Sequence, residues 1–178
     1  MNYDNTPTIL SSNRLLFRQH ILADMDAYCA MEMDANVRRY VGGQPRTREE
    51  AERKFMLSLE PVTDRLSMWS TVLKETGQYI GRCGVYPHFN HDGTPIADEG
   101  TLAFYIASEY WRQGFATEAA RAFIRFGFDV LHLKRIVATV QAGNDASCHI
   151  LKKLGFELVS TENGHRTFYH FELKNPVT

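Results

Sequence analysis

The residues best suited to chemistry lie in a short segment around Gly114, over residues 110–120. This segment joins an apolar run at residues 102–107 to an amphipathic run that continues to about Leu131, which predicts a strand, a tight turn and a helix. The first N–H groups of a helix have no partner within it, and the helix dipole makes that end partly positive. Because Gly114 lacks a Cβ, a ligand can approach the main chain closely there. The segment therefore predicts a cradle for a di-anion such as a pyrophosphate, although a glycine that serves only the turn would give the same pattern.

A second segment, residues 144–156, follows a run at residues 135–140 that is rich in β-branched residues and predicts a strand. Asn144 is suited to cap a helix, and Gly155 is suited to end one. Apolar residues recur along one side of this helix, at Ile150, Leu151 and Leu154. A capped surface helix would explain the segment on its own, so its meaning depends on its combination with the segment around Gly114.

The whole chain alternates strand and helix patterns in the order β α α β β β α β α β β. We expect strands at residues 8–18, 67–74, 78–86, 99–107, 135–140, 156–161 and 166–173, and helices at 24–33, 47–59, 116–131 and 144–154. Thr47 and Glu50 form a capping box at the start of the second helix, and we expect Pro61 to end that run. Turn-forming residues predict an exposed loop at 87–98.

The order of these elements predicts an α/β (α+β) fold with a mixed central β-sheet. Strand–helix–strand units in the second half of the chain require parallel neighbours, whereas the hairpins require antiparallel ones. We therefore expect helices on both faces of the sheet. The buried face of the helix at 116–131 is predicted to carry Ala116, Ala120, Phe123, Gly127 and Val130.

Length and composition favour a soluble globular protein. The chain has 178 residues, 44% of them hydrophobic and 23% charged, and we expect residues 1–178 to form one domain. A formal net charge of −1 argues against nucleic acid or an anionic membrane as a partner. The sequence has no apolar stretch near the roughly 20 residues that span a bilayer, and residues 1–7 lack the pattern of a signal peptide. We therefore expect a cytoplasmic location and no membrane partner.

The cysteine and histidine residues do not predict a metal site. Cys29, Cys83 and Cys148 are odd in number and far apart, which argues against a disulfide framework and a zinc site. His88 and His91 are most simply polar loop residues, because further spaced ligands are missing around them. Cys148 follows the helical pattern beside a histidine, but neighbours in a helix point about 100° apart and cannot form a dyad. We interpret Cys148 as a small core thiol.

Together, the segments around Gly114 and Asn144 resemble the GNAT acetyltransferase superfamily, in particular its branch of RimJ/RimL-like ribosomal-protein N-terminal acetyltransferases. Residues 111–119 are similar to the family's acetyl-CoA pyrophosphate loop, and residues 144–147 with 153–156 are similar to its second cofactor motif. Residues 14–18, Arg-Leu-Leu-Phe-Arg, are similar to the opening strand of the branch. The element order matches over essentially the whole chain. Trp111 departs from the wider superfamily, which often has Gln or Arg there, but this branch commonly has Trp.

The resemblance implies a site for acetyl-CoA between two splayed parallel strands. The strand that ends at Ile106 would diverge from the strand at 135–140, and main-chain groups of Phe104 and Ile106 would pair with the pantetheine amides, as an added strand does. The pyrophosphate would be held by Arg112, Gln113, Gly114, Phe115, Ala116 and Thr117. Asn144 would hydrogen-bond the pantetheine arm, and Ser147 would point toward the thioester sulfur. We expect no metal, and a homodimer is an expectation from the family alone.

The resemblance also implies direct transfer of an acetyl group from acetyl-CoA to a primary amine. An α-amino group, with a pKa of roughly 8, needs less help to lose its proton than a lysine side chain, with a pKa of about 10.4. The N–H of Ile106 is a candidate to stabilise the developing oxyanion. Ser147 is our first candidate for the proton donor to the leaving thiolate, with Tyr105 and Tyr110 as weaker candidates. Glu99 is our candidate base, acting through water.

Each of these assignments has a simpler alternative. Ser147 is also suited to satisfying the start of a helix, and Glu99 is also explained as a solvated carboxylate at the end of a strand. Glu118 lies in the first helical turn, where an acidic residue suits the dipole, so a structural role is favoured. By analogy with the family, residues 34–46 and 87–98 flank the acceptor entrance. Acidic residues there and nearby that could attract a cationic amine are Asp34, Asp92, Asp98 and Glu99.

Two other functions fit parts of the sequence. A CoA-binding sensor or scaffold that has lost transfer would keep the same cradle. A kinase is disfavoured because Gly114 is not followed by the Lys-Ser or Lys-Thr of a phosphate-binding loop that ligates Mg²⁺. The acceptor stays open between a ribosomal N-terminus, another peptide, a polyamine-like amine and a drug-like amine.

Overall fold

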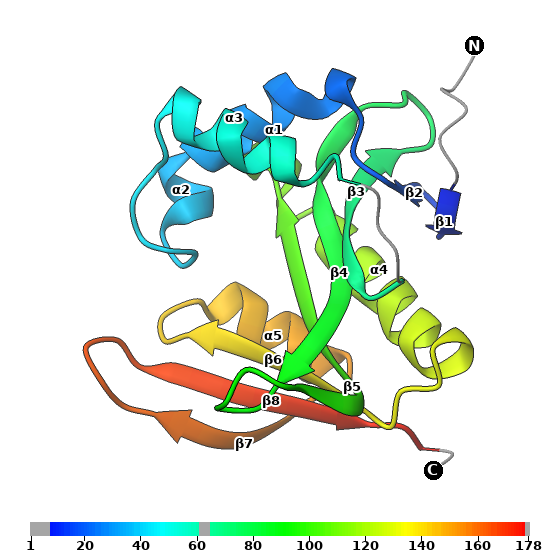
Figure 1. The fold of residues 1–178 in the computed structure, drawn as a ribbon, viewed down its shortest axis with the longest axis vertical. Helices are drawn as coiled ribbons and strands as arrows, with labels where there is room; N and C mark the ends of the chain where they lie inside the picture. The colour runs from blue at the N-terminus through cyan, green and yellow to red at the C-terminus, as the bar shows by residue number, and fades with distance from the viewer. Residues whose placement is uncertain (1–7, 61–64, 177–178) are drawn as a thin grey trace.

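The computed structural model describes residues 8–60 and 65–176, and within them eight strands form one sheet in the order β1-β2-β3-β4-β5-β6-β8-β7 (Figure 1). The strands are β1 Thr8–Ser11, β2 Leu15–Arg18, β3 Ser67–Leu73, β4 Tyr79–Phe89, β5 Pro95–Ile106, β6 Arg135–Gln141, β7 Glu157–Glu162 and β8 Phe168–Lys174. Neighbouring strands are antiparallel except β5 and β6, which run parallel. The mixed sheet is as expected. Pro61 and residues 1–7 lie outside the described residues.

Helices flank both faces of the sheet. They are η1 Leu22–Asp24, α1 Met25–Met33, α2 Ala35–Arg38, α3 Arg48–Leu57, η2 Ser108–Tyr110, α4 Phe115–Arg125, η3 Phe126–Val130 and α5 Asp145–Lys153. Arg82 on β4 donates to the Tyr28 hydroxyl, which places α1 on the face that carries Arg82. Cys83, the next residue on β4, packs in the main core with Phe123 of α4, so α4 covers the opposite face. Among the described residues, none of these helices has the length and apolar character needed to cross a membrane.

Local signals position the helices largely as predicted. The capping box at the start of α3 is present, because Thr47 Oγ1 accepts from the Glu50 N–H at 3.2 Å and the Glu50 carboxylate accepts from the Thr47 N–H at 2.8 Å. The helix expected at 116–131 is α-helical to Arg125 and continues as the π-helical turn η3. Val130 was expected to be buried and is 44% exposed, because the wider turn shifts the helical register. The short helix α2 was not predicted from the sequence.

Two strand boundaries differ from the sequence-based prediction. The strand expected at 8–18 is a hairpin of β1 and β2, whose turn is closed by the Ser12 N–H, which donates to Leu15 O at 2.9 Å. The exposed loop expected at 87–98 is shorter, because β4 continues to Phe89 and pairs with Pro95 at the start of β5. The polar residues between them form the turn of a long hairpin rather than a loop that separates two elements.

The parallel strands β5 and β6 diverge, as the resemblance implied. Within the described residues, their pairing covers Glu99 with Arg135, Gly100 with Ile136, and Thr101 with Val137. Beyond these pairs β5 continues to Ile106, paired on its other side with β4, and β6 continues to Gln141, paired with β8. The remainder of β5 therefore presents an edge toward β6 that no described strand occupies. This edge and the start of α4 are what the fold contributes to a site.

Candidate functional site

Gly114 forms the N-terminal cap of α4 in the left-handed conformation, with φ of 82°. A residue with a Cβ is strained there, and the helix start receives no hydrogen bond from a capping side chain. A Cβ built on Gly114 would meet Arg14 Nη2 at 3.5 Å as its nearest described neighbour, so the surface above the turn is open. Uncapped N–H groups at an open helix start fit a pyrophosphate, both by direction and by charge.

The other residues predicted for the pyrophosphate differ in what they can offer. Arg112 and Gln113 are exposed, and Arg112 also has a positive φ of 61°. Phe115 turns its side chain into the core, so its N–H is the part that faces the turn. Ala116 and Thr117 are half-buried in the first turn of α4. The predicted residues of this segment thus lie around one helix start. The groups that they can offer to a pyrophosphate are mainly main-chain N–H groups.

The open edge of β5 exposes main-chain groups of Phe104 and Ile106. The Ala107 N–H donates to Ile80 O on β4 at 2.9 Å, so alternate residues, including Phe104 and Ile106, direct their main chain toward β6. The indole of Trp111 donates to Ile106 O at 2.7 Å, which leaves the Ile106 N–H and both groups of Phe104 for a ligand. The sequence alone gave no signal for this contact of Trp111.

Helix α5 begins at the far end of β6 and carries the other predicted residues. Asn144 caps the helix, because its Oδ1 accepts from the Ser147 N–H at 3.2 Å. Asn144 therefore satisfies the helix start, and the Ser147 hydroxyl makes no hydrogen bond with any residue that the structure describes. Ser147 is half-buried. Its hydroxyl is chemically free to donate a proton or a hydrogen bond.

Glu99 lies at the opposite end of the opening, where β5 and β6 are still paired. Its Oε2 lies 2.7 Å from Arg135 Nη2, and Arg135 Nη1 lies 3.1 Å from Glu172 Oε2 on β8. The hydrogen bond with Glu99 is the main cause of a raised pKa of Arg135. Phe104 is five residues further along β5, about 17 Å away in an extended strand. Glu99 is thus ion-paired rather than solvated, and the structure does not bring it near Phe104.

The two tyrosines and the thiol considered from the sequence, Tyr105, Tyr110 and Cys148, each pack against other residues of the fold. The Tyr105 ring lies 4.8 Å from Arg82 Cζ, on the face of the sheet opposite α4. Tyr110 stacks edge-on to Phe115, and burial raises the pKa of Tyr110. Cys148 packs against the main core, and burial raises the pKa of its thiol, which agrees with a core thiol.

A charged cluster around Glu32 was not anticipated from the sequence. Glu32, on α1, is 2% exposed, and Arg38 Nη1 and Arg46 Nε approach its Oε2 at 3.2 and 2.8 Å. Arg82 Nη2 pairs with its other oxygen. We call Glu32, Arg38, Arg46 and Arg82 the arginine cluster. It lies on the face of the sheet that Tyr105 shares, across the strands from the opening.

Comparison with known proteins supports these assignments of fold. The acetyltransferase (GNAT) domain family matches residues 14–157. An uncharacterized N-acetyltransferase of Bacillus licheniformis, p20, is 31% identical over 153 residues, which are 83% of this chain and 82% of that protein. A GNAT-family acetyltransferase from Bacillus anthracis has a similar crystal structure, with a TM-score of 0.79 and 20% identity over 93% of this chain and 97% of that one.

Spermidine N-acetyltransferase from Vibrio cholerae, solved in complex with CoA and spermine, has a TM-score of 0.72 at 16% identity and covers 90% of this chain and 95% of that one. At such identities the two solved structures show the fold alone. The family match, however, spans most of the sequence and both segments on which the site depends. Because that match includes the sheet opening and the glycine-capped helix beside it, we conclude that the chain belongs to the GNAT acetyltransferase family.

Proposed function

We propose that the protein transfers the acetyl group of acetyl-CoA directly to a primary amine. The observation that carries this proposal is the edge of β5 beyond Thr101, which faces away from β4 and has no strand of the described residues beside it. An extended amide-containing arm fits such an edge as an added strand does. The glycine-capped start of α4 lies at the end of the same strand, after η2, where a pyrophosphate attached to that arm would lie.

Main-chain groups carry most of the proposed cofactor binding. The N–H groups from Arg112 to Thr117, including those of Gln113, Gly114, Phe115 and Ala116, hold the pyrophosphate. Phe104 offers both main-chain groups to the pantetheine arm, and Ile106 offers its N–H to the thioester oxygen, since Trp111 takes its carbonyl. The amide nitrogen of Asn144 is available to the same arm, because its oxygen caps α5.

The proposed reaction forms an N–C bond, breaks a C–S bond and moves one proton, overall, from the amine to the sulfur. The acetyl thioester supplies an activated carbonyl carbon; an N–C bond forms to the neutral amine as the C–S bond breaks. The same Ile106 N–H hydrogen-bonds the developing oxyanion in the proposed reaction. Ser147 donates a proton to the departing sulfur and regains one from water, and the amine releases its proton to water; Glu99, about 17 Å from Phe104 along β5, would accept that proton through a chain of waters. The Glu99 carboxylate is held in an ion pair by Arg135.

The acceptor class, the RimJ/RimL-like branch, the single-domain organisation of residues 1–178, a cytoplasmic location and a homodimer stay predictions. A protein N-terminal α-amine and a small-molecule amine both suit the chemistry. The solved Vibrio cholerae relative was bound to spermine, which makes a polyamine the natural reference acceptor for this chain.

An acceptor screen that follows free-thiol release from acetyl-CoA tests the proposed function. We expect thiol release that requires an amine and an acetylated acceptor of matching mass. Calorimetry measures the binding of CoA in parallel with this screen. Tight CoA binding without thiol release from any amine would replace transfer with the sensor or scaffold function, and failure to bind CoA would overturn both.

A further inference from the structure

Arg14, in the turn between β1 and β2, holds its guanidinium group over the start of α4. Its Nε donates to Glu118, its Nη1 donates to Gln113 O, and its Cζ lies over the ring of Phe115. These contacts approach the planar group from different sides and fix its orientation. The guanidinium is therefore already ordered before a ligand binds, which lowers the entropy cost of a further contact.

One nitrogen of this guanidinium, Nη2, has no hydrogen-bond partner among the residues that the structure describes. Nη2 is the nearest described atom to the position that a Cβ on Gly114 would take, at 3.5 Å. The Arg14 side chain is 44% exposed, and Gln113 and Gly114 are exposed beside it. A charged donor is thus available above the glycine turn, where we propose that the pyrophosphate approaches.

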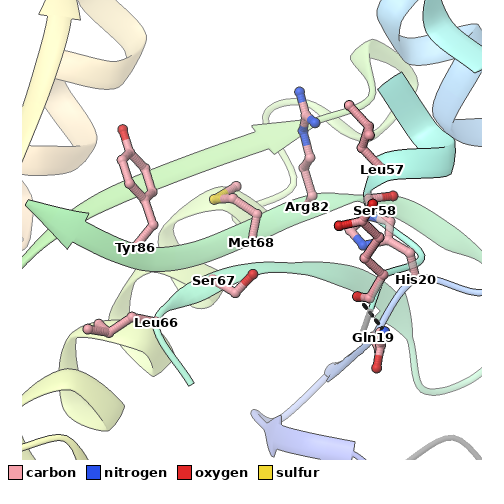
Figure 2. A pocket seen from close by; sticks show the side chains of 10 residues that line it. Gln19, His20, Leu57, Ser58, Leu66, Ser67, Met68, Arg82 and Tyr86 are labelled. Atoms are coloured by element: carbon pink, nitrogen blue, oxygen red, sulfur yellow. Dashed lines mark hydrogen bonds between the residues drawn. The ribbon is translucent and has the colours of Figure 1, made fainter. Parts of the chain in front are cut away.

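Arg82 shows how an arginine with a purely internal role differs from Arg14. Figure 2 shows Arg82 lining a cavity of about 260 Å³ together with Met68. Arg82 is 9% exposed, and its two terminal nitrogens are engaged by the Tyr28 hydroxyl and the Glu32 carboxylate. The guanidinium of Arg82 therefore serves the fold, whereas that of Arg14 keeps one terminal nitrogen for a ligand.

The order of the strands indicates which part of CoA reaches Arg14. The pantetheine arm is proposed to lie along β5, whereas Arg14 directly precedes β2, and β3 and β4 lie between these two strands. β2 and β5 are thus three strand spacings, about 14 Å, apart. The start of α4 is connected to β5 through η2 and to the β1–β2 turn through Arg14. A cofactor that follows β5 and continues past the helix start therefore meets Arg14 with the phosphate that is farther from pantetheine.

We propose that Arg14 binds the adenosine-side phosphate of the CoA pyrophosphate, and that it makes the protein selective for CoA thioesters over thioesters of 4′-phosphopantetheine. The main-chain N–H groups at the start of α4 hold the phosphate that both donors share. Nη2 of Arg14 donates to the phosphate that only CoA carries, in a charge-assisted hydrogen bond. This inference rests on the proposed function and adds a specificity-determining residue to its cofactor site.

Calorimetry with three ligands tests this contact without turnover. CoA is compared with dephospho-CoA, which lacks the 3′-phosphate but keeps the pyrophosphate, and with 4′-phosphopantetheine, which keeps only the pantetheine-side phosphate. We expect Arg14→Gln to weaken the binding of CoA and of dephospho-CoA at least tenfold, and that of 4′-phosphopantetheine less than threefold. Equal weakening for all three ligands would mean that Arg14 only supports the cradle, and weakening for CoA alone would place Arg14 at the 3′-phosphate; either result would overturn the proposal.

Two further variants control for net charge and for folding. Arg121→Gln removes an exposed arginine about two turns into α4, and we expect it to change each affinity less than threefold. A loss equal to that of Arg14→Gln would show a long-range charge effect and overturn the contact. If Arg14→Gln does not fold, Arg14→Gln combined with Glu118→Gln replaces it, because removing both members of the ion pair leaves no unpaired carboxylate. A wild-type ratio of CoA to 4′-phosphopantetheine affinity in that double variant would also refute the assignment.

Initial rates separate this inference from the proposed function. With acetyl-CoA and S-acetyl-4′-phosphopantetheine as donors, we expect Arg14→Gln to reduce the ratio of their kcat/KM values at least tenfold, through KM and with kcat nearly unchanged. If no amine releases thiol, the transfer function fails, but the difference between the ligands in calorimetry would still support the contact of Arg14. If thiol is released and the ligands show no such difference, the contact fails and acetyl transfer stands.

Discussion

Glu118 Oε2 accepts a hydrogen bond from Arg14 Nε at 2.7 Å, and this pair joins the β1–β2 turn to the first turn of α4. The other oxygen of Glu118 accepts from the Arg14 N–H and from Ser12 Oγ, each at 2.7 Å. Arg14 Nη1 then donates to Gln113 O at 3.1 Å, and its Cζ lies 4.3 Å from the Phe115 ring centroid. Glu118 is thus a structural support of the cradle, as favoured from the sequence.

Replacing Glu118 with Gln should therefore weaken both the fold and the cofactor site. We expect a loss of about 1–3 kcal/mol in the free energy of unfolding, because hydrogen bonds to a partly buried charge are lost. CoA affinity in calorimetry should fall severalfold, since the loop before α4 loses its anchor. Glu157→Gln, on exposed β7, is the control. Unchanged CoA affinity in Glu118→Gln would show that the cradle holds its shape without this anchor.

Gly114→Ala tests the cradle itself. A Cβ at φ of 82° costs roughly 1–2 kcal/mol and stands where a phosphate would approach. Gly93→Ala is a matched control, because Gly93 has φ of 81° in the β4–β5 turn and its Cβ would meet no described atom within 4 Å. We expect similar losses of stability in both variants, but a loss of CoA affinity of at least tenfold in Gly114→Ala alone. Equal CoA binding by the two variants would contradict the cradle.

Ser147→Ala tests the proposed proton donor. Removing a general acid should lower kcat at saturating amine by 10² or more, with little change in the KM for acetyl-CoA. Stability should be nearly unchanged, because the hydroxyl makes no hydrogen bond among the described residues. Ser160→Ala serves as the control for the loss of a hydroxyl. A fall of less than threefold in kcat would remove Ser147 from the chemistry.

Glu99 and Arg135 can be separated by their pH profiles. If Glu99 is the base, Glu99→Gln should lower kcat by 10² or more and remove the acidic limb of the pH profile. Arg135→Gln breaks the same ion pair but keeps the carboxylate, so it should retain that limb. Equal losses of activity in the two variants, with unchanged limbs, would instead mean that the pair fastens β5 to β6.

His20 predicts a specific dependence of stability on acid. Burial lowers its pKa from 6.5 to about 4, so the unfolded chain binds the proton more readily than the folded protein. Its contribution is present above pH 6.5 and is lost as the pH falls toward 4, by about 3 kcal/mol. His20→Gln should flatten this part of the curve of unfolding free energy against pH relative to His91→Gln, an exposed control. Parallel curves for the two variants would contradict the buried neutral imidazole.

The parts of the fold that were predictable depend on local pattern. The capping box of Thr47 and Glu50 and the glycine before α4 act within a few residues, so the sequence displays them directly. The divergence of β5 and β6 was inferred from the family resemblance, not from periodicity. The exposure of Val130 was missed, because a π-helical turn leaves no apolar signature of its own.

The charged groups were predicted least well. Glu32 meets Arg38, Arg46 and Arg82, which are 6, 14 and 50 residues away in the sequence. Ion pairs at such separations follow from the way helices dock on a sheet, and charged residues have no spacing that reveals it. The same holds for Glu99, which the sequence presents as an exposed strand end and the structure places beside Arg135.

The short parallel pairing has a mechanical consequence. Within the described part of the sheet, β1 to β5 form one leaf and β6 to β8 form another, and three residue pairs join them. A ligand that bonds to β5 on one side and to α5 on the other would clasp the two leaves together. Its binding should slow amide hydrogen exchange along the junction of β5 and β6 far more than at either outer edge of the sheet. The bound cofactor would then connect the two leaves mechanically.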